Sequence, residues 1–513
     1  MLFNSYIFIA VFLPTAVAAV WLAKCYLSHN AALAALTLAS LFFYAWWNPP
    51  YVILLLASIA ANYLIGRQVR HFKGVGRRSA ARILTILGVG ANLGIIGYYK
   101  YADFFVTNID GLTGLDFTIG VVLLPLGISF FTFQQIAYLV DSYREQVQPH
   151  NFLDYAMFIS FFPQLIAGPI VYHGEMLRQL HGEFALRFTS NDVAIGLTIF
   201  TMGLFKKVVL ADGMATYATP GFDAVEAGTV LNFLEAWSAA LAYTLQLYFD
   251  FSGYSDMAIG LGRIFGLRLP VNFNSPYKAD NIIEFWRRWH MTLSRFLRLY
   301  LYVPLGGNRR GPSRRWLNIM ITMLLGGLWH GAGWTFVVWG GLHGCYLAVN
   351  HLWRYLRTTV MGGVPITSPE RFAGFALTFV AVVVAWVFFR AENFTGALAM
   401  LEGMAGLNGI ILPEVWAGRL TPLLPILNNL GIQAGPTPLF DGSLQLASTV
   451  GLLLFVFLSP NSQEWVERQF EVDGRRPQGV SGALTATLFG CMAGYTAIRI
   501  FVGGYSEFLY FQF

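Results

Sequence analysis

Long apolar runs follow one another along the chain, separated by short polar stretches that often contain glycine or proline. A helix that crosses about 30 Å of hydrocarbon needs about 20 largely apolar residues. Because a helix satisfies its own backbone hydrogen bonds, we expect helices rather than sheet in lipid. The runs cover residues 6–23, 31–47, 51–65, 83–99, 118–140, 193–210, 233–261, 317–330, 331–349, 372–389, 444–458 and 482–500. This pattern predicts an all-α polytopic membrane protein with about 12 crossings, several of them tilted or broken.

The charges between the runs predict on which side of the membrane each loop lies. Lys24, the stretch 67–82 and Arg144 are basic, whereas the loop 103–116 carries acidic residues and no basic ones. Since basic residues collect in cytoplasmic loops, this alternation places both ends of the chain outside. No Lys or Arg precedes the first run. We therefore expect a retained first crossing rather than a cleaved signal peptide.

Two segments are predicted to enter and leave the membrane on the same face. The run 152–170 contains proline and glycine and is followed by further basic residues, which favours a re-entrant segment. The runs 317–330 and 331–349 lie between basic stretches. We expect them to form an out-and-back excursion with His330 at its midpoint.

The stretch 279–315 is the most basic part of the chain, and its arginines alternate with aromatic and aliphatic residues. This alternation predicts an amphipathic helix at the cytoplasmic interface. The alternative is that the arginines contact only lipid headgroups. They are Arg287, Arg288, Arg295, Arg298, Arg309, Arg310, Arg314 and Arg315.

Composition excludes two classes of protein. Hydrophobic residues make up 56% of the chain and charged residues 12%, which is about half the ~25% usual in soluble domains. A disordered chain or a soluble multidomain enzyme is not this apolar. The net charge of +6 fits cytoplasmic loops and membrane lipids better than nucleic acid. The scattered Cys25, Cys345 and Cys491 predict no metal site, and residues 1–513 are expected to form a single membrane domain.

Ionisable residues inside apolar runs are costly and are therefore candidates for chemistry. His330 lies among glycines that allow a helix break, and His290 follows a basic aromatic motif. His343 lies between small residues, which fit tight helix packing equally well. The alternative for these histidines is a core residue satisfied by the backbone.

Two acidic residues complete the set of candidates. Asp250 and Asp256 do not share a helical face, so they do not form an obvious pair of carboxylates. Asp250 either orients groups in a polar cavity or pairs with Arg263 or Arg268. No nucleophile-elbow, phosphate-loop or zinc-protease motif is present in the sequence. A histidine-centred site suits proton abstraction from an alcohol, for which a positioned base contributes about 10²–10⁴-fold.

Several motifs resemble the membrane-bound O-acyltransferase family, and its bacterial alginate O-acetyltransferase branch most of all. The longest are FWRRWHMTLS at 285–294, YLYVPLGGN at 300–308 and GLWHGAGW at 327–334. Shorter matches are FDFSGYSD at 249–256, PLGISF at 125–130, FPQ at 162–164, AGP at 167–169 and the ending YFQF at 510–513. The resemblance runs from one end of the chain to the other.

The resemblance implies helices around a central tunnel, with His330 as the catalytic histidine and His290 as the second histidine of the family. The donor would be a cytoplasmic acyl thioester, acetyl-CoA or an acyl carrier, with no tightly bound cofactor and no metal. Periplasmic acetyltransferase partners would pass the acetyl group from the bacterial inner membrane to an exopolysaccharide, alginate or cellulose-like. The expected substrate-binding residues are Trp286, Arg287, Arg288, Trp329, Asp250 and Asn308.

One position departs from the branch, because Leu299 stands where an aspartate is usual. If that aspartate pairs with an arginine, the pairing is absent or replaced here. Two other functions remain open at this point. One is D-alanyl or other acyl transfer to a teichoic-acid-like polymer, and the other is transport of a polysaccharide or lipid. Transporters often show paired broken segments in inverted repeats, and the sequence shows no such pairing.

Overall fold

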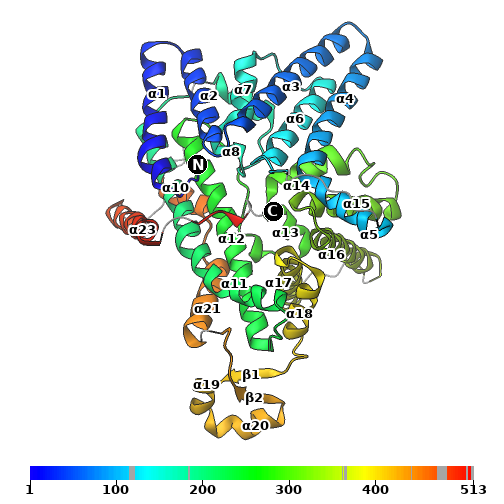
Figure 1. Cartoon of the computed structure of the whole chain (residues 1–513), viewed down its shortest axis with the longest axis vertical. Coiled ribbons are helices and arrows are strands. Elements are labelled where there is room, and N and C mark those ends of the chain that lie inside the picture. The colour runs from blue at the N-terminus through cyan, green and yellow to red at the C-terminus, as the bar shows by residue number, and fades with distance from the viewer. Residues whose placement is uncertain are drawn as a thin grey trace. The chain divides into compact units, whose positions relative to one another are not determined.

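The computed structural model describes residues 1–114, 122–182, 185–360, 362, 365, 367–440, 442–470, 482–503 and 506–509. Within these ranges the chain is helical apart from one short sheet (Figure 1). Residues 118–121 of the fifth apolar run and the ending 510–513 lie outside the described residues.

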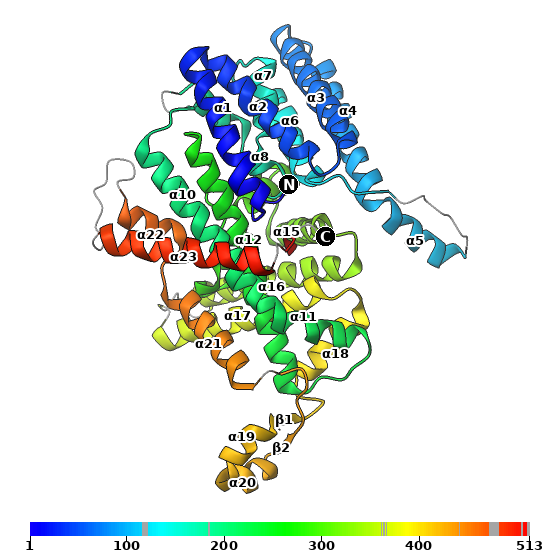
Figure 2. The same cartoon turned by 60° about the vertical axis from the view of Figure 1, so that its left-hand side comes forward.

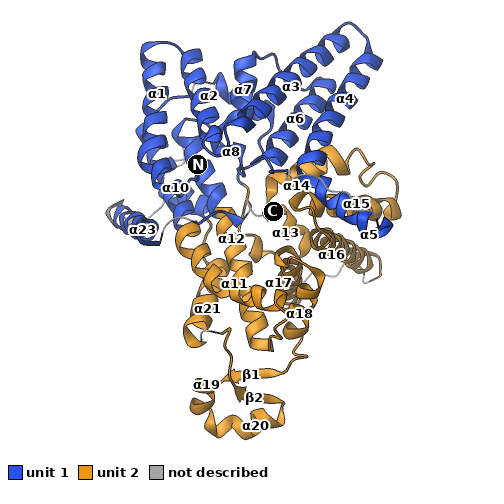
Figure 3. Ribbon diagram, in the orientation of Figure 1, with its two compact units in different colours: residues 1–205, 253–271, 462–512 blue, residues 206–252, 272–461, 513 orange. Residues whose placement is uncertain are grey.

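The chain divides into two compact units (Figure 3). Unit 1 comprises Met1–Phe205, Gly253–Val271 and Ser462–Gln512, and unit 2 comprises Lys206–Ser252 and Asn272–Asn461. The long helix α12 (Phe233–Ile264) contributes to both units. The single domain expected for residues 1–513 stays a prediction.

Unit 1 consists of helices that pack along one another, α1 against α2 and α3 against α4 and α6 (Figure 2). Side-chain caps stabilise some helix starts. At the start of α2, the Ser28 hydroxyl accepts a hydrogen bond from the Ala31 amide. The helices are η1 (Ile7–Phe12), α1 (Leu13–Tyr26), α2 (His29–Ala45), α3 (Pro50–Gly74), α4 (Arg78–Ile96), η2 (Gly97–Tyr101), α5 (Ala102–Thr113), α6 (Ile128–Tyr143), α7 (Phe152–Ser160), α8 (Phe162–Leu165), α9 (His173–Leu180), α10 (Ser190–Phe205), α22 (Ser462–Gln469) and α23 (Gly482–Gly503).

The segment predicted to be re-entrant is buried in unit 1. It forms the short helices α7 and α8, which are separated by the non-helical Phe161. At 1.5 Å per residue, a helix of the length of α7 spans only about 14 Å, which is half of the hydrocarbon layer. Neither helix is therefore long enough to cross by itself, and the re-entrant path stays a prediction.

Unit 2 holds the histidine motifs. Its elements are η3 (Lys206–Ala211), α11 (Asp212–Glu226), the first part of α12, η4 (Pro276–Lys278), α13 (Ile282–Arg288), α14 (Met291–Leu297), η5 (Arg298–Tyr302), α15 (Pro312–His330), α16 (Trp334–Thr359), α17 (Ser368–Arg390), α18 (Phe394–Met404), β1 (Ile410–Pro413), α19 (Glu414–Arg419), η6 (Thr421–Leu423), α20 (Leu424–Asn429), β2 (Ile432–Gly435) and α21 (Gly442–Leu458). The strands β1 and β2 pair in parallel, with Ile410 opposite Ile432. This sheet was not expected, and it lies in a stretch between the apolar runs, where the hydrocarbon constraint does not apply.

Only part of the predicted set of about 12 crossings has the length and apolar composition of a membrane span among the described residues. Among the described residues, six helices are long and apolar enough to cross a membrane, or seven if α21 and α22 form one bent span. The six are Ile7–Tyr26, Pro50–Gly74, Arg78–Thr113, Ser190–Glu226, Ser368–Arg390 and Ala486–Gly503. The expected crossings at 233–261, 317–330 and 331–349 are helical, but polar residues such as Asp250 and His330 interrupt their apolar sequence.

The excursion at 317–349 forms the helix pair α15 and α16, joined by the turn Gly331–Gly333. Glycines let the two backbones approach closely. A Cβ atom at Gly327 would collide with the Phe336 carbonyl oxygen, and one at Gly340 would collide with the Met323 carbonyl oxygen. The helix break lies at the predicted midpoint and places His330 at the end of α15, beside α16. The excursion into the membrane stays a prediction.

Candidate functional site

The predicted amphipathic helix is broken at His290. Helix α13 ends at Arg288 and α14 begins at Met291, and His290 between them has a left-handed backbone with φ of +43°. Residues 272–274 form backbone hydrogen bonds on both sides of this break. The Asn274 amide donates to the Arg288 carbonyl at 2.9 Å, and the Met291 amide donates to the Asn272 carbonyl at 2.9 Å. A non-glycine residue in this conformation is strained, and such residues are often found at functional sites.

The side chain of Asn272 determines which nitrogen of His290 carries the proton. Its Oδ1 accepts hydrogen bonds from the Thr292 amide at 3.2 Å and from the Thr292 hydroxyl at 2.9 Å. The same oxygen lies 3.1 Å from His290 Nδ1. Because an amide oxygen only accepts, Nδ1 is the protonated nitrogen and Nε2 keeps its lone pair. Burial lowers the pKa of His290 to about 3, so the ring is neutral near pH 7.

His330 lies close to His290, with the two ring centroids 6.4 Å apart. His330 is buried, and aromatic rings surround it. The nearest are Trp329 at 4.9 Å, Trp339 at 5.1 Å and Phe389 at 5.1 Å between ring centroids. The structure thus brings together two histidines that lie 40 residues apart in the sequence, in surroundings that exclude water.

His343 belongs to the same aromatic cluster and carries its proton on the other nitrogen. The indole N–H of Trp286 donates to His343 Nδ1 at 3.3 Å. An indole nitrogen only donates, so Nδ1 of His343 is the acceptor and Nε2 carries the hydrogen. Trp339 bridges the histidines, because its ring centroid lies 4.8 Å from that of His343 and 5.1 Å from that of His330.

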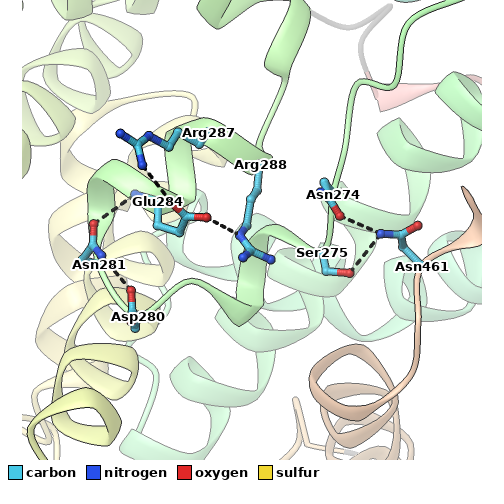
Figure 4. A network of polar contacts seen from close by, with 8 residues as sticks. All are labelled: Asn274, Ser275, Asp280, Asn281, Glu284, Arg287, Arg288 and Asn461. Carbon is cyan, nitrogen blue, oxygen red and sulfur yellow. Dashed lines mark hydrogen bonds and ion pairs between the residues drawn. The ribbon is translucent and has the colours of Figure 1, made fainter. Parts of the chain in front are cut away.

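The two predicted arginines meet a carboxylate rather than the histidines. Arg288 Nε lies 2.9 Å from Glu284 Oε1, and Arg287 Nη1 lies 3.4 Å from Glu284 Oε2 (Figure 4). Arg287 is exposed, whereas Arg288 is half-buried and lines an open pocket of about 600 Å³. The pocket is lined by Lys278, Asp280, Glu284, Arg288, Ser368, Arg371, Phe372 and Phe375.

A second polar contact in Figure 4 anchors the segment that forms backbone hydrogen bonds on both sides of the His290 break. The Asn461 amide nitrogen, just beyond α21, lies 2.8 Å from Asn274 Oδ1 and 3.4 Å from Ser275 Oγ. Asn274 in turn holds the end of α13 through its own backbone amide. The strained turn is therefore held by contacts from a part of the chain more than 160 residues away.

Three other sequence candidates have different surroundings. Trp329 lies on α15 directly before His330, and its ring centroid is 6.1 Å from that of His290. Asn308 is exposed in the turn before α15, unlike the buried histidines. Leu299, the position that departs from the family motif, is 37% exposed in η5.

Asp250 forms a buried ion pair, but not with the arginines that the sequence suggested. Its Oδ1 lies 2.7 Å from Lys207 Nζ, which also lies 2.9 Å from Asp212 Oδ1. Arg263 instead pairs with Asp192 at 2.7 Å. The sequence did not suggest Lys207 as a partner, because it precedes Asp250 by more than 40 residues.

Sequence reasoning missed Asn272, Trp339 and Phe389 as neighbours of the histidines. The sequence offers only a weak indication of Asn272, which is a polar residue in a short stretch rich in asparagine and proline. It offers none of the two aromatic residues, because phenylalanine and tryptophan are common throughout this chain. Among the described ranges, no group of three His, Cys, Asp or Glu residues is placed to hold a metal ion.

Comparison with known proteins places these residues in a family. The profile of the membrane-bound O-acyltransferase family matches residues 7–390, which include both histidine motifs. A peptidoglycan O-acetyltransferase of Helicobacter pylori is 45% identical over 439 residues, covering 80% of this chain and 81% of that protein. A probable alginate O-acetylase AlgI of Pseudomonas putida is 39% identical over 521 residues, covering 100% of both chains. A teichoic acid D-alanyltransferase of Streptococcus thermophilus is 25% identical over 288 residues, covering 52% of this chain and 68% of that protein.

Proposed function

Since this chain belongs to the membrane-bound O-acyltransferase family and is a multi-pass O-acetyltransferase, we propose that it O-acetylates a bacterial polysaccharide. The acetyl group comes from a thioester, acetyl-CoA or an acyl carrier, on the cytoplasmic side of the inner membrane. It leaves through a periplasmic acetyltransferase partner. The observation that carries the proposal is the buried pair of His290 and His330, with ring centroids 6.4 Å apart.

In this reaction His330 acts as the general base. The acceptor hydroxyl gives its proton to His330 while its oxygen attacks the carbonyl carbon of the thioester. The carbon–sulfur bond then breaks, and the thiolate takes up the proton that His330 received from the hydroxyl. The rings around His330 keep water away from the thioester, which limits its hydrolysis.

For His290 we propose a role in orientation rather than in polarising the thioester carbonyl. A group that polarises the carbonyl must donate a hydrogen bond, but the N–H of neutral His290 is held by Asn272. The free lone pair on Nε2 accepts instead. We therefore assign His290 to orienting the attacking hydroxyl or the ring of His330.

The open pocket beside Arg288 supports entry of an anionic donor. Lys278, Arg288 and Arg371 supply three positive charges, against the two negative charges of Asp280 and Glu284. A thioester donor carries phosphate groups, which arginines bind well.

The acceptor polymer is either an exopolysaccharide such as alginate or the peptidoglycan. Relatives named for each polymer match this chain at 39% and 45% identity, so identity does not separate them. Transfer of D-alanine to a teichoic acid has less support, because that relative matches 52% of the chain at 25% identity. Transport is set aside, because the family consists of acyltransferases.

The test measures ester-linked acetate in both polymers from a strain that lacks the chromosomal gene. The strain is complemented with the wild-type chain, with His330→Ala or with His351→Ala, at equal protein levels in the membrane. His351 lies on α16, in the same unit as His330, so its variant controls for loss of a histidine from this unit. Alkaline release and chromatography then quantify the acetate in each polymer.

In the His330→Ala strain, we expect the ester-linked acetate content of one polymer to fall by at least about 10²-fold, because the general base is removed. His351→Ala should retain it. The polymer that loses acetate identifies the acceptor. If His330→Ala leaves acetate unchanged in both polymers, the proposed function is wrong.

A further inference from the structure

Transfer of an acetyl group places a negative charge on the carbonyl oxygen, and the site needs N–H groups to receive that charge. Hydrogen-bond donors aimed at this oxygen usually supply a large part of the rate enhancement of acyl transfer. The N–H of His290 is engaged with Asn272. The donors must therefore come from other residues of the aromatic cluster.

Trp339 contacts the His330 ring, and His343 follows Trp339 along the same face of α16 and contacts it. Trp339 and His343 are four residues apart, so their side chains follow one another along the same side of the helix. Both side chains are buried, Trp339 at 1% exposure and His343 at 0%. The Trp339 ring stands edge to face with the His330 ring, at 86° between planes and 5.1 Å between centroids.

Each of these two residues has a buried N–H group without a hydrogen-bond acceptor among the described residues. For Trp339 this group is the indole Nε1–H. For His343 it is Nε2–H, because Trp286 donates to the opposite nitrogen of the ring. Buried donors are nearly always paired in proteins, since an unpaired one is costly. Trp339 contacts the proposed base, and His343 contacts Trp339. Two unpaired donors in such a cluster are expected where a ligand supplies the acceptor.

We propose that Trp339 Nε1–H and His343 Nε2–H bind the carbonyl oxygen of the donor thioester and stabilise the charge that it gains. When the acceptor oxygen bonds to the carbonyl carbon, the electron pair of the C=O double bond moves to this oxygen. When the pair returns, the carbon–sulfur bond breaks and the thiolate leaves with the proton held by His330. Both N–H groups keep their protons throughout.

The surrounding residues suit this role. Trp386 stacks on Trp339 with ring centroids 5.7 Å apart and 19° between planes, and Phe389 lies 5.3 Å from Trp339. Rings packed in this way hold the indole in one orientation and lower the local polarity. Hydrogen bonds to a developing charge are stronger in such surroundings than in water.

The experiment separates the position of the N–H group from the packing of the ring. In His343→Gln the side-chain amide nitrogen reaches the place of Nε2, whereas in His343→Asn it reaches only the place of Nδ1. Both variants bury an amide in the same site, so they share the cost of losing the ring. Trp339→Phe keeps an aromatic ring and removes the second donor.

The readout is the initial rate at which labelled acetate enters the polymer, per amount of membrane-inserted protein. Expression is kept low enough that the wild-type rate is proportional to the amount of protein. We expect His343→Gln to stay within about 10-fold of the wild type, and His343→Asn and Trp339→Phe to fall about 10²-fold or more. Equal rates for the Gln and Asn variants, or a wild-type rate for Trp339→Phe, would overturn the proposal.

This inference rests on the proposed function, and the two fail differently. His330→Ala is measured in the same strains. If it keeps the wild-type rate, the proposed function is wrong. If it loses the rate while His343→Asn and Trp339→Phe keep theirs, only the role of the two N–H groups is wrong.

Discussion

His150 in unit 1 and the pair His290 and His343 in unit 2 have opposite surroundings. In unit 1, His150 donates from Nδ1 to the Gln148 carbonyl at 2.8 Å, and its Nε2 lies 3.1 Å from the Tyr138 hydroxyl. Tyr138 in turn accepts from Arg70 at 2.9 Å. In unit 2, His290 and His343 each have one nitrogen paired, and the other has no partner among the described residues.

This difference separates a structural histidine from a functional one. The chain of Arg70, Tyr138 and His150 uses both nitrogens of the imidazole, so the ring stabilises the fold and offers nothing to a ligand. His290 and His343 use one nitrogen to fix the ring and leave the other available. The available groups are also complementary, a lone pair on His290 and an N–H on His343.

The largest effect is expected at His290. His290→Phe keeps an aromatic ring and removes the lone pair that orients the hydroxyl or the His330 ring, so polymer acetylation should fall by about 10²-fold at equal protein level. The initial rate of acetate incorporation measures this loss. A rate within a few-fold of the wild type would show that the unpaired nitrogen of His290 has no part in the reaction.

A smaller effect, on stability, is expected at Asp250. Asp250→Asn removes the negative charge of Asp250, whose Oδ1 lies 2.7 Å from Lys207 Nζ, and leaves Asp212 as an ion-pair partner of Lys207. Because Asp212 still compensates Lys207, the loss of stability stays below the ~3–5 kcal/mol of an uncompensated buried charge, and the thermal midpoint of the purified protein should fall by a few degrees. Activity per folded molecule should stay near the wild-type value. A large loss of activity in fully folded protein would instead place Asp250 in the reaction, as the sequence suggested.

The smallest effect is expected at His150. His150→Phe removes two hydrogen bonds at the edge of unit 1, each worth about 1 kcal/mol, and touches none of the catalytic groups. The thermal midpoint should fall slightly, while the rate of acetate incorporation stays within about twofold of the wild type. A rate loss comparable to that of His290→Phe would contradict the distinction between the two kinds of histidine.

The helical class and the candidate histidines could be predicted because they depend on local properties. The apolar runs are long enough to identify helices, and an ionisable residue such as His330 stands out among glycines and apolar neighbours. Among the described residues, fewer helices than the expected number of about 12 are long and apolar enough to span a membrane, because polar residues interrupt some of the apolar runs. Helices α12 and α15 show this, since they carry Asp250 and His330 among their apolar residues.

By itself, the sequence determined a helical membrane protein, a basic face and two histidine motifs that mark an acyltransferase. Only the tertiary structure decided how the histidines are used. Which nitrogen carries a proton depends on the group that faces it, and those groups, Asn272 for His290 and Trp286 for His343, lie 18 and 57 residues away along the chain. Tautomers and unpaired donors follow from contacts made at a distance in the sequence, and no local pattern specifies them.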